Sequence, residues 1–344
     1  MKTKADYKQN KIEHLDMKQV DVRPLVDGMG KTAFQARNLA RAARIYEQML
    51  RDGECTVILT LAGSLFGAGL KKIVYDMVKN NMVDAIVSTG AIMIDQDFFE
   101  GLGYRHYQGS ALADDDELDR LNIDRVYDHY QDDDELDQCD RTIAKIAETL
   151  PKRVYSSREF IRELGAYLVK YGKNPESVIQ ACYEKEVPIF VPAFSDCSAG
   201  FGLVYHQWHA KGEKVVIDSV KDFLELTKVK IAAKETGIVM IAGGVPKNFV
   251  QDAAVSAAWV GHKRPMHKYA IQLTVADERD GALSGSTLRE AHSWGKVDLA
   301  NEQMVFGEAT VTFPLLAGYG YHSMAWKERK EQRLSRVVDE MDPK

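Results

Sequence analysis

A β-α-β pattern between residues 53 and 91 constrains the fold of this chain more than any other feature. Residues 55–61 are apolar or β-branched throughout, which is typical of a strand buried on both faces. Small residues follow at once, then a helical pattern over residues 70–79, and then a second strand pattern over residues 85–89. Because parallel strands need a long crossover connection, usually a helix, this pattern predicts a parallel sheet.

The alternation of strand and helix patterns continues toward the C-terminus. Strand patterns lie at residues 188–193, 214–218, 237–244, 269–276 and 305–311, and helical patterns such as 219–230 and 248–258 separate most of them. We therefore predict an α/β fold with one doubly wound, mostly parallel, Rossmann-like sheet. Residues 28–330 would form this single domain, with an N-terminal extension at residues 1–27 and a C-terminal tail at residues 331–344.

Composition narrows the class of protein. The 344 residues contain no run of 18 apolar residues, and the N-terminus lacks the apolar stretch of a signal peptide, so we expect neither membrane insertion nor export. The four cysteines show neither CxxC nor Cys/His metal spacing, which favours reduced thiols and a cytoplasmic location. A net charge of -6 disfavours non-specific binding to nucleic acid.

Two acidic clusters, at residues 114–117 and 132–135, raise the question of a metal site. Neither has the glycine turn and terminal glutamate of an EF-hand loop, so we interpret both as solvated surface. His206 and His209 are three residues apart, but no adjacent carboxylate pattern completes a zinc site. We therefore expect no metal.

Four loops rich in small residues follow predicted strands. Because ligands of open α/β sheets lie beyond the carboxyl ends of the strands, these loops are the first place to look for a site. Glycine there lets the backbone approach a phosphate at a helix N-terminus. Each loop alone also fits an ordinary turn, and none is a strict GxGxxG, but together they favour a nucleotide. They are Ala62-Gly63-Ser64, Thr89-Gly90-Ala91, Ser195 to Gly200, and Ala242-Gly243-Gly244.

A lysine, Lys296, stands two positions after Trp294. In a partly apolar site, desolvation favours the neutral amine of a lysine, and that amine is a nucleophile. The face of the Trp294 ring would also attract a cationic substrate. The residues alone equally allow a surface lysine after a turn.

Ordered motifs from about Gly28 to about Leu316 make most of the chain resemble the deoxyhypusine synthase family. The most specific motif is Ser293-Trp294-Gly295-Lys296, preceded by Glu290-Ala291. The other motifs are Phe34-Gln35-Ala36 with Asn38, Asn81-Met82-Val83-Asp84, Asn174-Pro175-Glu176-Ser177-Val178, Asp196-x-Ser198-x-Gly200, Gly243-Gly244-Val245-x-Lys247 and Phe313-Pro314-Leu315-Leu316.

The resemblance implies a transfer reaction without net redox change. In the family, NAD accepts a hydride from the carbon beside the secondary amine of spermidine, and the resulting imine loses 1,3-diaminopropane. A lysine then carries the butylamine unit as an enzyme imine to an acceptor amine, and NADH reduces the product. By this resemblance Lys296 is the nucleophile, Trp294 packs along the polyamine, and Glu290 faces a substrate ammonium.

The resemblance also implies a cofactor and an assembly. NAD is the expected cofactor, a polyamine or related amine is the expected substrate, and the family forms homotetramers with active sites between subunits. The residues expected against NAD are Ser64, Thr89, Gly90, Asp196, Ser198, Gly243, Gly244, Asp280, Glu308 and Ala309.

Substrate positions of the family carry different residues in this chain. Phe201 and Leu283 stand where the family has spermidine-anchoring aspartates, and Asn248 takes the substrate-site position of a family histidine. Loss of both carboxylates would leave a buried ammonium unpaired, at a cost of about 3–5 kcal/mol. At roughly 1.4 kcal/mol per decade this is two or more powers of ten in binding.

Cofactor positions differ as well. The first loop is Ala62-Gly63-Ser64, where the family has Thr-Ser-Asn. A family glutamate expected after Thr89 has only Asp95 or Gln96 nearby, across an insertion.

Three accounts stay open. One is an altered amine substrate, such as one ending in a guanidinium, held by Asp95, Asp277 or Glu278. Another is homospermidine-synthase-like transfer to putrescine, or true deoxyhypusine synthase activity. The last is a non-catalytic NAD-binding paralogue that acts as a scaffold or regulatory subunit. A simple amine dehydrogenase is a further enzyme alternative. Retention of Glu290, Trp294 and Lys296 favours an enzyme over the non-catalytic account. Loss of the two family carboxylates favours small amines over a protein as acceptor.

Overall fold

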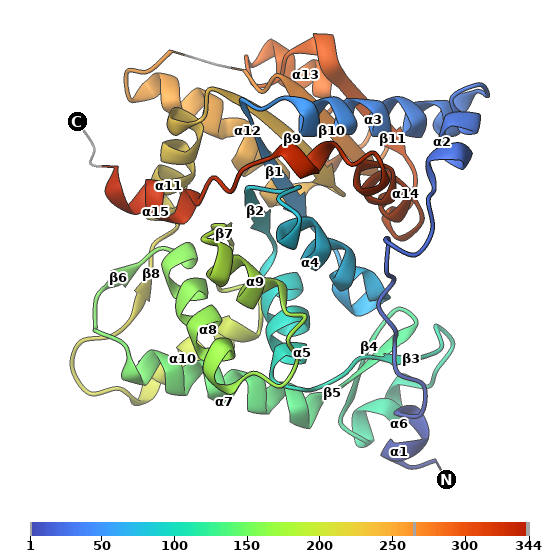
Figure 1. The fold of residues 1–344 in the computed structure, drawn as a ribbon. Helices are drawn as coiled ribbons and strands as arrows, with labels where there is room; N and C mark the ends of the chain where they lie inside the picture. The colour runs from blue at the N-terminus through green and yellow to red at the C-terminus, as the bar shows by residue number, and fades with distance from the viewer. Residues whose placement is uncertain (1, 264–265, 342–344) are drawn as a thin grey trace.

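A six-stranded parallel sheet forms the centre of the molecule (Figure 1). The computed structural model describes residues 2–263 and 266–341. The strand order is β11-β10-β9-β1-β2-β7, which is the order of a Rossmann fold. The chain adds strands first on one side of β1 and then on the other, so the order reverses between β1 and β9. Every pairing in this sheet is parallel, so the predicted doubly wound sheet is confirmed. The strands are β1 (Cys55–Leu61), β2 (Ala85–Ser88), β7 (Ile189–Phe190), β9 (Glu235–Ile241), β10 (Tyr269–Thr274) and β11 (Glu302–Phe306).

Helices cover both faces of this sheet because its central strand is apolar on both sides. Val57, Leu59 and Leu61 of β1 pack into one core with α3, α4 and α14. Ile58 packs into a second core with α11, α12, α13 and α15. All of β1 is buried, as its continuous apolar run predicts. The helices are α3 (Phe34–Arg51), α4 (Lys71–Lys79), α11 (Ser219–Ala232), α12 (Gly244–Trp259), α13 (Leu288–Ser293), α14 (Ala309–His322) and α15 (Leu334–Glu340).

Three of the predicted strands differ most from the observed ones, and those predicted at 237–244 and 269–276 end earlier, at Ile241 and Thr274. The prediction at residues 214–218 is wrong for the central sheet, because β8 (Val216–Ile217) pairs with β6 (Val154–Tyr155) elsewhere. The strand predicted at 305–311 ends at Phe306, because Glu308 accepts a hydrogen bond from the Thr310 N–H at 2.8 Å and begins α14. The strand predicted at 188–193 is reduced to the short edge strand β7.

A small antiparallel sheet of order β3-β5-β4 follows β2 in the chain. The acidic clusters cap helices beside it, with Asp114 before α6 and Asp132 before α7. The Asp132 side chain is only 6% exposed and pairs with Lys4 and Lys8, so the interpretation as solvated surface is wrong for Asp132. The elements in this part of the chain, from the end of β2 to α7, are η2 (Ala91–Phe98), α5 (Phe99–Gly101), β3 (Tyr107–Gln108), α6 (Asp115–Arg120), β4 (Ile123–Val126), β5 (His129–Asp132) and α7 (Asp133–Thr149).

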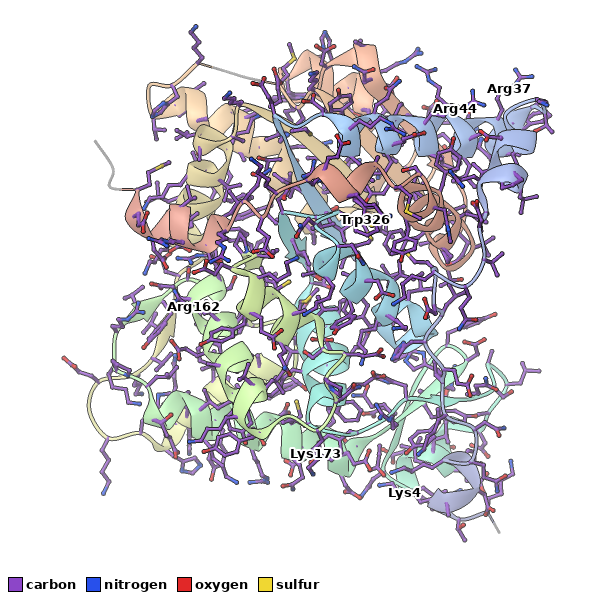
Figure 2. All side chains as sticks on the ribbon, viewed as in Figure 1. Lys4, Arg37, Arg44, Arg162, Lys173 and Trp326 are labelled. Atoms are coloured by element: carbon purple, nitrogen blue, oxygen red, sulfur yellow. The ribbon has the colours of Figure 1, made fainter. Side chains whose placement is uncertain are left out.

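The N-terminal residues run along this small sheet. Lys4, labelled in Figure 2, lies 2.5 Å from Asp132, and the Ile12 N–H donates to the His106 carbonyl at 2.9 Å. The extension begins with α1 (Lys4–Tyr7), and α2 (Arg23–Met29) spans the predicted domain boundary at residue 28. That boundary and the one at residue 330 stay predictions.

Two general features of the chain bear on where it could act. In the described ranges no helix is long and apolar enough to cross a membrane. All four cysteines are buried and free of disulfide bonds.

The remaining helices of the described chain are η1 (Phe66–Leu70), α8 (Ser157–Tyr171), α9 (Val178–Lys185), α10 (Ser198–His209), η3 (Leu283–Gly285), η4 (Leu299–Asn301) and η5 (Ala325–Glu328).

Candidate active site

A cleft of about 1470 Å³ lies at the carboxyl edge of the central sheet. The loops after β1, β9, β10 and β11 line it, on both sides of the point where the strand order switches. In open α/β sheets this crevice is where ligands bind. Among the residues expected against NAD, Ser64, Glu308 and Ala309 line the cleft directly. Residues 9–13 of the N-terminal extension and residues 126–129 of the small sheet line it as well.

A buried glutamine fixes the first of these loops. Gln96 donates from Nε2 to the Ser64 hydroxyl at 2.9 Å, and its Oε1 accepts from the Phe66 and Gly67 N–H groups at 2.9 and 2.8 Å. Gln96 belongs to the π-helix η2, which places an additional residue within its turn.

A second group of predicted cofactor residues meets on the β2 and β7 side of the sheet. Gly90 packs against the side chain of Cys197, and the Ser198 N–H donates to Asp95 Oδ1 at 2.8 Å. Burial raises the pKa of Asp95 to about 7 and that of Asp140 to about 6. Thr89, Gly90, Asp196 and Ser198 are not among the described residues that line the cleft.

The remaining predicted cofactor residues lie at the N-terminus of α12 and in the loop after β10. Gly243 faces Ser284 so closely that an added Cβ would lie 2.7 Å from the Ser284 Cα. Gly244 has φ of +70°, a conformation that favours glycine. Asp280 is exposed and caps its own loop, accepting from the Ala282 N–H at 3.1 Å. Of these loops, Ala242 and Ser284 reach the cleft.

These features fit a dinucleotide. The cleft exceeds the roughly 300–1,000 Å³ of ordinary ligand pockets. The N-terminus of α14 at Ala309 opens directly on it, and the N-terminus of α12 follows Ala242. Gly243 begins α12 without a side-chain cap, so the free N–H groups and helix dipole there favour phosphate, whereas the Glu308 carboxylate already caps α14.

The predicted nucleophile, Lys296, lies beside helix α12. Its Nζ is 2.7 Å from Asp252 Oδ1, 3.4 Å from Asn248 Oδ1 and 5.5 Å from the centre of the Trp294 ring. The Lys296 side chain is 12% exposed, whereas Trp294 is 62% exposed. The structure thus brings together three of the predicted site residues, Lys296, Trp294 and Asn248.

Sequence reasoning missed Asp252. Asn248 donates from Nδ2 to Asp252 Oδ2 at 2.8 Å, so the carboxylate is held from both sides. Asn248 and Asp252 are four positions apart on α12 and therefore share one helix face. That spacing inside the predicted helix 248–258 was the available signal. The contact between Asp252 and Lys296 depends on how α12 packs against the loop after α13.

Glu290 has a structural role in this chain. It forms a capping box with Thr287 at the start of α13, in which the Thr287 N–H donates to Glu290 Oε2 at 3.3 Å. Lys247 lies nearby, fully buried, and donates to the Ser286 carbonyl. Burial lowers the pKa of Lys247 to about 8, although Glu290 opposes that shift.

The residues at the lost carboxylate positions are exposed. Phe201 on α10 is 70% exposed and Leu283 in η3 is 41% exposed. Among the proposed replacement acids, Asp277 pairs with Arg279 at 2.8 Å, and Asp95 is engaged with Ser198. The acid in contact with Lys296 is Asp252.

The cleft and the lysine are linked through α12. This helix begins beside the cleft at Gly244 and reaches Asn248 after four residues, a rise of about 6 Å along its axis. Within the described part of the chain, no group of three histidine, cysteine or acidic side chains is placed to hold a metal ion.

The sequence and the fold of this chain are similar to those of known proteins. A family model described as deoxyhypusine synthase matches residues 24–319. A deoxyhypusine synthase-like protein from Chlorobaculum parvum is 58% identical over 337 residues, covering 98% of this chain and 96% of the relative. A Methanosarcina mazei protein named "Probable deoxyhypusine synthase 2" is 40% identical, covering 94% and 92%. A proposed deoxyhypusine synthase from Entamoeba histolytica shares the fold, with a TM-score of 0.62 at 18% identity over 93% of this chain and 99% of that chain.

Proposed function

Because this chain belongs to the deoxyhypusine synthase family, we propose that it is an NAD-dependent transferase of alkylamine groups. It would move an aminobutyl-type group from a polyamine-like donor to an acceptor amine. The group would be carried as an imine on Lys296. We propose that the protein acts in the cytoplasm, as a homotetramer with active sites between subunits, on small amines rather than on nucleic acid.

The observation that carries this proposal is the setting of Lys296. A lysine that is 12% exposed, fixed between a carboxylate and an amide and beside a tryptophan ring, differs from the surface lysine that the sequence also allowed. The backbone is fixed too, since the Lys296 N–H donates to the Ala291 carbonyl and its own carbonyl accepts from the His267 N–H. Such positioning is what an amine nucleophile requires.

The cleft would hold NAD. We propose that Ser64, Glu308 and Ala309 contact it directly and that the α12 N-terminus at Gly243 and Gly244 faces its phosphates. Thr89, Gly90, Asp196, Ser198 and Asp280 belong to the same proposal. When bound, NAD would accept a hydride from the donor amine and later return it to the product.

The donor is proposed to differ from spermidine. Phe201 and Leu283 offer apolar, partly exposed surface where the family holds a cationic chain with carboxylates. The acid beside the nucleophile is Asp252, which pairs with Lys296. Glu290 would face a substrate ammonium only at the edge of the site, since its side chain is exposed and caps α13.

The test is intact mass after incubation with NAD and one amine at a time. Spermidine, putrescine and agmatine are each added, and borohydride traps any imine. The proposal predicts an adduct in the wild type that is absent from Lys296→Ala, with NAD binding retained in that variant. The mass of the adduct would identify the transferred group. Turnover that survives in Lys296→Ala would overturn the nucleophile, and NADH accumulating without an adduct would indicate an amine dehydrogenase.

A further inference from the structure

One carboxylate, Asp252, holds the ammonium of Lys296 in place. We propose that Asp252 is the specificity-determining anchor for the cationic nitrogen next to the reacting carbon of the substrate, and that binding of this nitrogen releases Lys296 as a free amine. This inference rests on the proposed function, in which Lys296 is the nucleophile.

The geometry leaves Asp252 open to a second cation. Its Oδ1 lies 2.7 Å from Lys296 Nζ, and its Oδ2 accepts from the Asn248 amide at 2.8 Å. Each carboxylate oxygen can accept more than one hydrogen bond, so both keep acceptor capacity. The Asp252 side chain is 33% exposed, compared with 12% for Lys296, so an incoming ligand reaches the carboxylate without first displacing the lysine.

The surrounding charges favour an exchange of partners. Lys247 is occupied with the Ser286 carbonyl, and Glu290 caps α13 through Thr287. Asp252 is therefore the acid that a cation near Lys296 would meet. A second positive charge beside one carboxylate disfavours the ammonium form of Lys296, because like charges at close range oppose ionisation.

The exchange gives a balanced reaction step. The Lys296 ammonium loses one proton to water at the exposed side of Asp252. The electron pair of Nζ then forms a bond to the carbon of the substrate iminium. A proton moves from Nζ to the substrate nitrogen, the bond between that nitrogen and the carbon breaks, and the nitrogen leaves as an amine. The lysine iminium that remains keeps one positive charge, and Asp252 pairs with it.

The test uses two aldehydes of the same shape and no cofactor. Betaine aldehyde carries a fixed positive charge one carbon from its carbonyl, and 3,3-dimethylbutanal is its uncharged isostere. Each aldehyde forms an iminium with a lysine and releases water, and cyanoborohydride reduces that iminium to a stable adduct. Intact mass gives the rate of adduct formation, and Lys296→Ala identifies the part due to Lys296. The ratio of the rate with the charged aldehyde to the rate with the neutral one measures charge selectivity. When this ratio is compared between variants, the difference in intrinsic reactivity between the two aldehydes cancels.

We expect Asp252→Asn to lower the charged-to-neutral rate ratio by about tenfold, the size of one close charge pair, because the trimethylammonium group of betaine aldehyde has no N–H to donate. Adduct formation with the neutral aldehyde should persist, and a circular dichroism spectrum equal to that of the wild type should show that the variant is folded. Asp252→Glu should restore part of the ratio. Asp116→Asn removes an exposed carboxylate on α6 and should leave the ratio unchanged.

Two results would contradict the inference, and they differ in meaning. If Asp252→Asn keeps the wild-type ratio while Lys296 still reacts, Asp252 is not the anchor, and the proposed function stands. If neither aldehyde modifies Lys296 in the wild type, the lysine is not a nucleophile, and the proposed function fails together with this inference.

Discussion

The side-chain amide of Gln96 clamps the loop that contains Ser64, donating to the Ser64 hydroxyl at 2.9 Å while it accepts from two N–H groups at the start of η1. The clamp joins the loop after β1 to the π-helix after β2, so the first loop proposed to contact the cofactor is held by the ends of two strands. Gln96 is 5% exposed, and water therefore cannot replace these hydrogen bonds easily.

Replacement of Gln96 by leucine should loosen this loop. Two buried N–H groups lose their acceptor, and each unsatisfied group costs about 1–3 kcal/mol. We expect the free energy of unfolding to fall by at least about 2 kcal/mol and NAD to bind about tenfold or more weakly. Urea unfolding and calorimetric titration with NAD measure the two effects. Gln138→Leu, on an exposed position of α7, is the matched control.

Substitution of Gly243 by alanine should disturb the start of α12. The new methyl group would lie 2.7 Å from the Ser284 Cα, a backbone atom that cannot yield as a flexible side chain does. We expect the α12 N-terminus to shift away from the cleft and NAD affinity to fall by about tenfold or more. Gly53→Ala adds a methyl group where no atom lies within 4 Å, and it should bind NAD like the wild type. Equal affinity in both variants would argue against phosphate at this helix.

The buried carboxyl of Asp95 predicts a pH dependence of stability. Its pKa is about 7 in the folded chain, above the usual value of 3.8, because burial disfavours the charged form. The folded state therefore binds this proton more tightly than the unfolded state, and stability is lost as the pH rises from about 4 to about 7. Asp95→Asn keeps the acceptor for the Ser198 N–H and removes the titration.

The stability gained in Asp95→Asn should consequently be small near pH 4, increase up to pH 7 and stay level above it. Urea unfolding of both proteins at pH 4.5, 6 and 8 checks the trend. A gain that is constant across these pH values would show that Asp95 does not titrate as its burial implies.

The ion pairs of the N-terminal extension should hold residues 9–13 in place as one wall of the cleft. Lys4 and Lys8 both contact Asp132, and residues 9–13 that follow them line the cleft. Replacing both lysines by methionine removes these two partly exposed partners of Asp132, which keeps its hydrogen bonds from the Asp134 and Glu135 N–H groups, at a cost of roughly 1–3 kcal/mol. We expect faster amide hydrogen exchange at Ile12 and Gln108, whose N–H groups join the extension to β3. Lys2→Met is the control, and unchanged exchange in the double variant would mean that the extension is held by its backbone contacts alone.

The sequence allowed prediction of those parts of the fold that depend on local periodicity. The apolar run of β1 is typical of a strand covered on both faces, and the loops after β1 and β9 were identified from their small residues. The prediction failed at residues 214–218 because an apolar alternation indicates a strand without indicating which sheet it joins. It failed at residues 307–311 because the cap at Glu308 outweighs the β-branched residues that follow.

The candidate site was predictable only as far as single motifs extend. Lys296 and Trp294 lie in one motif, so both were found together. Asp252 lies 44 positions before Lys296, and only the packing of α12 against the loop after α13 brings the two side chains to 2.7 Å. The spacing of residues in the sequence does not predict a contact between residues so far apart in the chain.

The most direct test of the proposed mechanism is to locate the trapped imine within the chain. The protein is incubated with NAD and the amine that gives an adduct, reduced with borohydride, digested and sequenced by tandem mass spectrometry. The proposal predicts the added mass on Lys296. Lys247 is the informative competitor, because burial lowers its pKa to about 8 and it lies on the same helix as Asn248. An adduct on Lys247, or on any residue other than Lys296, would contradict the account.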